Sequence, residues 1–115
     1  LPSDEKALLD RCAGEVMLFR LKGPLSFGAA KGITERMMLV RNYKVLILDI
    51  TDVPRLGVTA TLAIEDMVQE AKANSRKAYV AGANQIVKER LSKFGVEVIG
   101  SRKEALEAAI SSINS

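Results

Sequence analysis

The chain has 115 residues, which is enough for one two-layer domain and too few for two. Apolar residues make up 48% of it and charged residues 27%, a balance typical of a folded globular protein. It contains no histidine and a single cysteine. These counts exclude Ser-His-Asp and Cys-His catalysis, zinc sites built on histidine or on several thiolates, and a disulfide within the chain.

The net charge of +3 is unevenly spread. Residues 1–15 carry a net charge of −2, so the remaining 100 residues carry +5. A mildly basic domain of this kind suits an acidic partner or an anionic membrane surface. Nucleic acid is not an expected partner, because the basic residues are scattered and only five aromatic residues are present. No apolar run reaches the ~18 residues of a membrane span, and the acidic start is not a signal peptide. Because the chain begins with Leu1, we interpret it as part of something longer.

Residues 1–14 are predicted to be a lead-in helix, or the tail of a linker, that starts near Ser3 or Asp4 and stops at Gly14. Residues 16–21 favour a strand that ends at Gly23-Pro24. From residue 26 to residue 41 the apolar period becomes helical. The predicted buried face of that helix consists of Phe27, Ala30, Ile33, Met37 and Val40.

Residues 44–50 form a nearly continuous apolar run, which predicts a central strand buried on both faces. A loop over residues 51–57 contains Pro54, and a helix is expected from residue 58 to residue 73. The predicted inward side of this helix consists of Ala60, Ile64, Met67, Val68 and Ala71.

The rest of the chain repeats the alternation of strand and helix. Residues 77–81 predict a strand, and Asn84 caps a helix that ends at Gly95. Its apolar residues are Ile86, Val87, Leu91 and Phe94. Residues 96–99 predict a short strand, and Ser101 begins the last helix with Glu104 as the partner in a capping box. Strands that alternate with helices in this way predict an α/β fold with parallel pairing.

Residue types that carry chemistry are few. Residues 28–32 are loosely glycine-rich but lack the spacing of a phosphate-binding loop. Asp49 and Asp52 could hold Mg²⁺ or serve acid–base chemistry, but no third acid or lysine is placed beside them, which favours a structural role. Cys12 has only Arg11 to activate it, which favours a passive apolar role. We therefore expect no catalytic residue, no metal ligand and no cofactor.

The most informative segment is the loop from Asp52 to Thr59. It joins the carboxyl end of the central strand to the start of a helix, where open α/β sheets place their binding sites. The free N–H groups of a helix start favour an anion. We therefore predict that an anion or a protein partner contacts Asp52, Arg55, Gly57, Val58 and Thr59.

The outer side of helix 58–73 is predicted to extend this contact surface. Val58 and Leu62 lie off the inward stripe, next to polar residues that include Asp66 and Gln69. Isolated exposed apolar residues need no special explanation. Beside the loop, however, Leu62, Asp66 and Gln69 form a candidate contact surface, with Leu62 as its apolar anchor.

Two motifs resemble a known family. The helix entry Gly-Pro-Leu-x-Phe-x-x-Ala spans residues 23–30, and Leu-Ile-Leu-Asp at residues 46–49 precedes Val53-Pro54. In this combination the chain is similar to STAS domains, and most of all to those of SulP-family anion transporters. The resemblance covers residues 15–115, with residues 1–14 as the lead-in from an upstream membrane domain. It implies a small α/β sandwich with a mostly parallel sheet of four to five strands and about four helices.

The resemblance also implies a function without catalysis. It implies a regulatory and assembly domain on the cytoplasmic side of the plasma membrane, in a transporter of bicarbonate (coupled to sodium) or of sulfate. Its implied partners are its own membrane domain, a second copy in a homodimer, and a cytosolic regulator. Thr59 matches the phospho-acceptor of the family's Asp-Ser-Ser/Thr-Gly pattern, but the acid has become Gly57. Two alternatives stay open: a free phospho-switch resembling an anti-sigma-factor antagonist, and a sulfate-transporter tail that binds a nucleotide.

Overall fold

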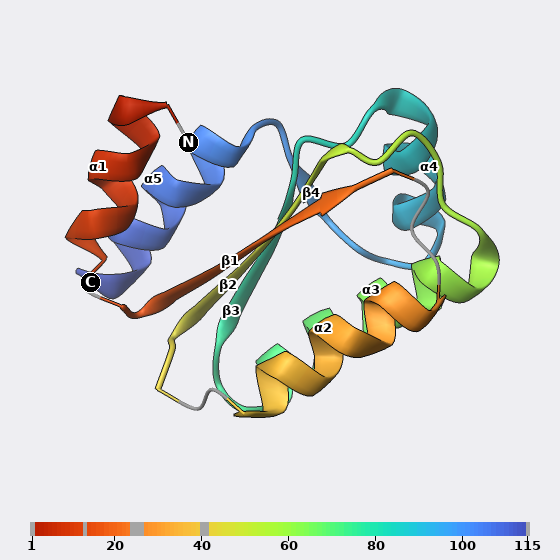
Figure 1. Ribbon diagram of the computed structural model, residues 1–115, viewed down its shortest axis with the longest axis horizontal. Helices are drawn as coiled ribbons and strands as arrows, with labels where there is room; N and C mark the ends of the chain where they lie inside the picture. Colours follow the sequence, from red (N-terminus) through yellow and green to blue (C-terminus); the bar gives the residue numbers. More distant parts are fainter. Residues whose placement is uncertain (1, 13, 24–26, 40–41, 115) are drawn as a thin grey trace.

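A computed structural model describes residues 2–12, 14–23, 27–39 and 42–114 of the chain. Its helices and strands alternate along the sequence (Figure 1). In chain order they are α1 (Ser3–Arg11), β1 (Val16–Lys22), α2 (Phe27–Leu39), β2 (Val45–Asp52), α3 (Val58–Ala73), β3 (Lys77–Ala81), α4 (Gln85–Lys93), β4 (Val98–Ile99) and α5 (Arg102–Ile113). The predicted α/β fold is confirmed.

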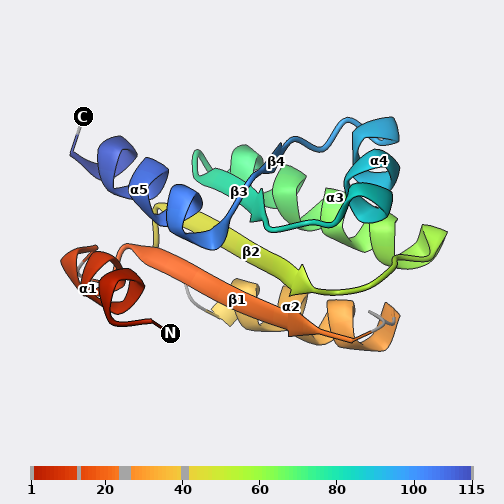
Figure 2. The same cartoon turned by 90° about the horizontal axis from the view of Figure 1, so that it is seen from above.

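The four described strands form one sheet in the order β1-β2-β3-β4, and each neighbouring pair is parallel. Parallel neighbours need a crossover between them, and α2, α3 and α4 provide the three crossovers. These helices cover one face of the sheet, while α1 and α5 lie side by side on the other (Figures 1 and 2). The sheet is thus the middle layer of a sandwich.

The central strand β2 explains why the core has two parts. Its residues 45–50 are all buried, because helices cover both of its faces. Leu46, Leu48 and Ile50 belong to the larger apolar cluster, which includes residues of α2, α3 and α4. Val45 and Ile47 belong to a smaller cluster under α5. Since side chains alternate along a strand, Asp49 points to the same side as Val45 and Ile47.

Several predicted boundaries are confirmed and others are wrong. The helix over residues 58–73 and the strand over 77–81 have the predicted bounds. The strand β2 runs to Asp52 rather than to Ile50, because the Asp52 carbonyl accepts from Gly23 N–H at 2.9 Å beside β1. The strand β4 is shorter than predicted, because Val96 N–H donates to the Leu91 carbonyl at the end of α4 instead of to the sheet.

The predicted buried side is confirmed for α3 but only in part for α2. All five inward residues predicted for α3 are buried. The apolar residues named for α4 do not share one side: Val87 and Leu91 are buried, whereas Ile86 is 70% exposed, because it lies one residue round the helix from Val87. In α2, Ile33 is buried as predicted. The side chains of Phe27, Ala30 and Met37, and all of residue 40, lie outside the described residues.

Two predicted caps are confirmed. The Asn84 side chain accepts a hydrogen bond from Val87 N–H at 2.8 Å at the start of α4. The Ser101 hydroxyl accepts from Glu104 N–H at 3.1 Å and donates to the Glu104 carboxylate at 3.3 Å at the start of α5. In the described part of the chain, no helix is both long enough and apolar enough to cross a bilayer.

Candidate functional site

The predicted contact loop lies at the carboxyl end of β2, on the side of the sheet that α3 covers. Val53 and Leu56 are buried and anchor the loop to the larger cluster. Arg55 and Gly57 between and after them are exposed. Asp52 is exposed as the last residue of β2, not as a loop residue as predicted. The loop is therefore held in place by its two buried residues, and its other side is accessible to solvent.

The start of α3 presents an open helix end. Gly57 is the N-cap in an extended conformation and provides no side chain to accept from the first-turn N–H groups. Its carbonyl accepts from both the backbone N–H and the hydroxyl of Thr61, at 3.0 and 2.8 Å. Val58 and Thr59 follow it and are exposed. Helix starts carry partial positive charge, so the exposed end of α3 favours contact with an acidic group.

The outer face of α3 extends from this open end. Val58 is 53% exposed and Leu62 43% exposed. Asp66 and Gln69, at helical spacing from Leu62, are also exposed. These four residues form one stripe, which we call the α3 face. The structure thus leaves all of the predicted contact residues exposed, and their role in contact stays a prediction.

The helix α4 begins beside the same loop, which the sequence did not indicate. The Asn84 amide donates to the Pro54 carbonyl at 3.0 Å. Its neighbour Ile86, in the first turn of α4, exposes 70% of its surface. The only sequence signal for this exposed residue was an apolar side chain next to a helix cap. Ile86 is exposed because its neighbour Val87 occupies the buried side of the helix.

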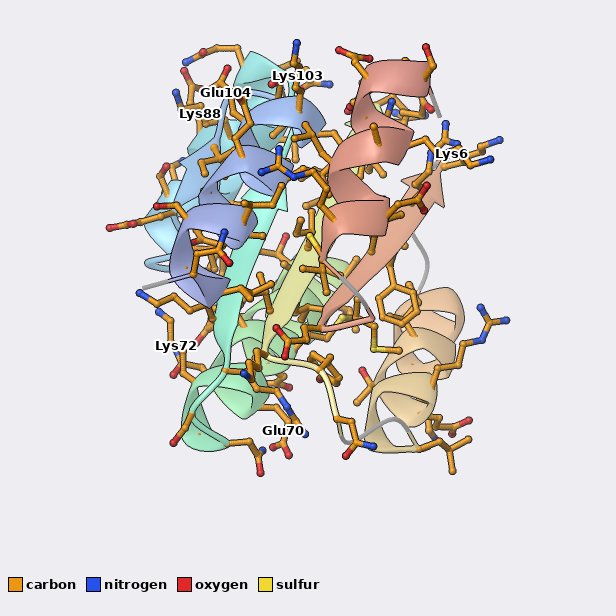
Figure 3. The ribbon with its side chains drawn as sticks, turned by 90° about the vertical axis from the view of Figure 1, so that its left-hand side faces the viewer. Lys6, Glu70, Lys72, Lys88, Lys103 and Glu104 are labelled. Atoms are coloured by element: carbon orange, nitrogen blue, oxygen red, sulfur yellow. The ribbon has the colours of Figure 1, made fainter. Side chains whose placement is uncertain are left out.

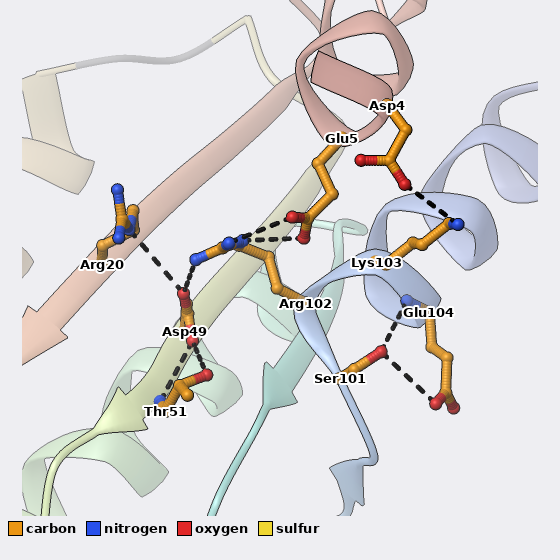
Figure 4. Close-up of polar contacts among 9 residues, drawn as sticks. All are labelled: Asp4, Glu5, Arg20, Asp49, Thr51, Ser101, Arg102, Lys103 and Glu104. Carbon is orange, nitrogen blue, oxygen red and sulfur yellow. Dashed lines mark hydrogen bonds and ion pairs between the residues drawn. The ribbon is translucent and has the colours of Figure 1, made fainter. Parts of the chain in front are cut away.

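A second polar cluster lies on the opposite face of the sheet, and the sequence did not predict it (Figure 4). Arg102, the first residue of α5, donates from Nη1 to Asp49 Oδ2 at 2.7 Å. It also donates to both carboxylate oxygens of Glu5 in α1, from Nε at 2.9 Å and from Nη2 at 3.1 Å. Arg20 of β1 adds a looser contact with Asp49 at 3.9 Å. One guanidinium therefore joins α1, β2 and α5.

The electrostatics of this cluster are those of a structural ion pair. Burial disfavours the charged form of Asp49, but hydrogen bonds from Thr51 and Arg102 outweigh burial and hold the pKa of Asp49 below its ordinary value. Hydrogen bonds from Arg102 to Glu5 and Asp49 raise the pKa of Arg102, which stays charged. The structural reading of Asp49 therefore has a physical basis.

The structure does not combine Asp49 and Asp52 into a carboxylate pair. Asp49 is buried against Arg102, whereas Asp52 is exposed at the end of the strand. Among the residues described, no group of three His, Cys, Asp or Glu side chains is placed to hold a metal ion. The signal for the Asp49 cluster was an acid in an apolar strand, which needs a buried partner. That partner is 53 residues away and could not be read from the local sequence.

Comparison with known proteins identifies the family. The STAS domain family model matches residues 8–109. This chain belongs to the STAS domain family. Two bicarbonate transporters BicA, from Synechocystis sp. and Picosynechococcus sp., are each 38% identical to the STAS domain over 117 residues. The alignment covers 96% of this chain and 21% of each transporter.

Solved structures agree with this assignment. The STAS domain of a SulP transporter from Vibrio cholerae matches with a TM-score of 0.81 and 27% identity, and the match covers 97% of this chain and 98% of that one. A sulfate transporter family protein from Wolinella succinogenes matches with a TM-score of 0.80 over 89% of this chain. Its 20% identity supports the fold alone. The resemblance to SulP-type STAS domains is therefore confirmed, and this STAS domain spans about a fifth of the curated transporters that it matches.

Proposed function

We propose that this STAS domain is the cytoplasmic regulatory and assembly domain of a SulP-type anion transporter, whose cargo is bicarbonate taken up with sodium. The observation that carries the proposal is the 38% identity to both BicA transporters over 96% of the chain. Because the matched region is only 21% of those proteins, the membrane-spanning transport machinery belongs to the rest of such a transporter. The domain itself then acts by binding on the cytoplasmic side of the plasma membrane, without catalysis.

The surface proposed to act is the α3 face together with the loop that precedes it. Val58 and Leu62 provide exposed apolar area, and Arg55, Asp66 and Gln69 provide polar groups around it. A stable interface between free proteins needs about 1,000 Å² or more of buried area. A smaller one is enough when a membrane anchor raises the effective concentration of the partner. The partners proposed are the transporter's own membrane domain and a second copy of this domain.

The test is Leu62→Asp in the full-length transporter. We expect a lower dimer fraction and several-fold slower bicarbonate uptake, because a charge replaces the apolar anchor at an exposed position that the fold does not need. Leu39→Asp is the matched control, since Leu39 is also an exposed leucine, 83% exposed, but ends a different helix, α2. Unchanged oligomer size together with unchanged uptake in Leu62→Asp would reject the proposal. Loss of uptake with an intact dimer would identify the membrane domain as the partner.

A phospho-switch is the second candidate function, and the exposure of Thr59 in the first turn of α3 favours it. A phosphate there would suit the helix dipole and would add negative charge to the α3 face. Gly57 provides no acid beside it. The test is incubation with an anti-sigma-type kinase, followed by mass measurement of the wild type and of Thr59→Ala. Phosphate on Thr59 would support the switch, and an unmodified chain would leave the assembly role. Calorimetry with ATP, GTP and bicarbonate tests the remaining alternative of a small-ligand regulator.

A further inference from the structure

The helix α1 is held to the domain by a small set of contacts. It has nine residues, and Glu5 is its one buried member. Leu8 and Leu9 are partly buried and pack against the smaller cluster under α5. A helix of this length is not stable alone in water. The helicity of α1 therefore depends on its contacts with α5, beside which it lies in Figure 3.

Two ion pairs join the start of α1 to the start of α5. The Glu5 carboxylate accepts two hydrogen bonds from Arg102, with both side chains largely buried. Lys103 lies 3.0 Å from Asp4, but more than half of each side chain is exposed there, so this pair contributes little. The Glu5–Arg102 pair is thus the main polar attachment, because it is charge-assisted, doubly bonded and shielded from solvent.

Apart from Leu8 and Leu9, which pack against the smaller cluster, α1 contributes little to the apolar core of the domain. Arg102 also donates to Asp49 at 2.7 Å, a contact that does not involve α1, so its charge has a partner besides Glu5. The larger apolar cluster contains no residue of α1. A segment with few buried contacts beside an independent core is the kind that opens separately from global unfolding.

We propose that α1 is a latch: it detaches from α5 and returns to it as one unit, while the rest of the domain stays folded. The Glu5–Arg102 ion pair holds the latch closed. When closed, it connects residues at the start of the chain to β2 and α5 through Arg102. In the transporter proposed above, the latch passes a movement of the preceding chain to the sheet. This transfer of movement rests on the proposed function, whereas the latch itself does not.

Cys12 reports the state of the latch. It follows α1 directly, is 2% exposed, and donates from Sγ to the Leu8 carbonyl at 3.3 Å. It is the one cysteine in the 115 residues. A thiol reagent therefore reacts with this chain only when Cys12 is uncovered, by opening of the latch or by unfolding of the whole domain.

The experiment measures the rate at which Cys12 of the 115-residue chain reacts with a thiol reagent. We expect Glu5→Gln and Glu5→Ala to react about tenfold faster than the wild type. Asp10→Asn is the matched control, because Asp10 is an exposed acid in the same helix, and we expect no change in its rate. Urea denaturation followed by circular dichroism should show that all three variants still unfold cooperatively, as a folded domain does.

A second measurement needs no variant. In the wild type, we expect the labelling rate to stay nearly constant in low urea, because a small opening exposes little surface, while global unfolding responds steeply. Labelling that follows urea as steeply as global unfolding would overturn the latch, as would equal rates in Glu5→Ala and Asp10→Asn. Neither result bears on bicarbonate uptake, so failure of the latch is distinguishable from failure of the proposed function.

Discussion

Glu5 and Arg102 lie 97 positions apart in the chain, yet both oxygens of the Glu5 carboxylate accept hydrogen bonds from the Arg102 guanidinium. The same guanidinium reaches Asp49 in the central strand at 2.7 Å. Two carboxylates thus share one cation between layers of the sandwich (Figure 4). Because all three side chains are mostly shielded from solvent, the balance of charge within this cluster matters for stability.

Removal of the shared cation is predicted to be costly. Arg102→Met keeps most of the side-chain volume but removes the shared cation, so that Asp49 keeps only its looser 3.9 Å contact with Arg20. We expect the free energy of unfolding to fall by about 3 kcal/mol, measured by urea denaturation. Arg55→Met is the control, since Arg55 is exposed in the loop before α3, and it should change stability by less than about 0.5 kcal/mol. If Arg102→Met lowered the free energy of unfolding by less than about 1 kcal/mol, the two carboxylates would not depend on Arg102 for their stabilisation.

Acid is predicted to weaken the domain through Asp49. Its pKa is lower in the folded state than in the unfolded state, where it is about 3.9. The stabilisation is therefore complete above about pH 4 and is lost as the pH falls from there through the folded pKa. We expect Asp49→Asn to be less stable than the wild type at pH 7, with the gap shrinking at lower pH. A gap that stays constant from pH 6 to pH 3 would contradict this prediction.

Alkaline conditions are predicted to act through Cys12. Burial raises the pKa of its thiol, and Glu15 adds to the effect against an opposing contribution from Arg11. The folded state then holds its proton more tightly than the unfolded state, so this stabilisation is full below about pH 8.5 and is lost as the pH rises through the folded pKa. Cys12→Ala should approach the wild type in stability between pH 8 and pH 10. A constant difference in stability between Cys12→Ala and the wild type from pH 8 to pH 10 would contradict this prediction.

The two sides of α3 should respond differently to truncation. Ile64 is fully buried in the larger cluster, so Ile64→Ala removes packed atoms and should cost about 2–5 kcal/mol. Leu62, two residues earlier, is 43% exposed, and Leu62→Ala should cost less than about 0.5 kcal/mol. Urea denaturation of both variants measures the difference. Equal losses would mean that Leu62 packs into the domain and is not free for a partner.

Two glycines should respond in opposite directions to alanine. Gly82 has a φ of 80°, and a Cβ added there would overlap the Thr51 hydroxyl, so Gly82→Ala should destabilise by more than about 1 kcal/mol. Gly32 lies inside α2, where a Cβ meets nothing within 4 Å. Gly32→Ala should therefore stabilise the domain by about 0.5–1 kcal/mol through helix propensity. Thermal unfolding of both variants checks the two signs. A destabilising Gly32→Ala would show that this face of α2 needs its glycine.

The sequence by itself determined the elements of this fold and their buried sides. Apolar residues at helical spacing predicted the α3 core side from Ala60 to Ala71, and Asn84 and Ser101 marked two helix starts. These signals are local, since periodicity and capping involve residues within a few positions of one another. Apolar character alone does not assign a side, since Ile86 is exposed and its neighbour Val87 is buried one residue further round the same helix. The local nature of these signals also explains why a loop could be predicted between the central strand and α3, while its role in contact stays a prediction.

Only the tertiary structure decided which distant residues meet. Asp49 was visible as an acid in an apolar strand, but its partner Arg102 begins a helix 53 residues later, and Glu5 comes from the opposite end of the chain. The placement of Asn84 against Pro54 beside the contact loop is of the same kind. Such contacts depend on the order of strands in the sheet and on the face that each crossover helix covers. No local pattern encodes that arrangement, because it follows from burying all of the apolar faces at once.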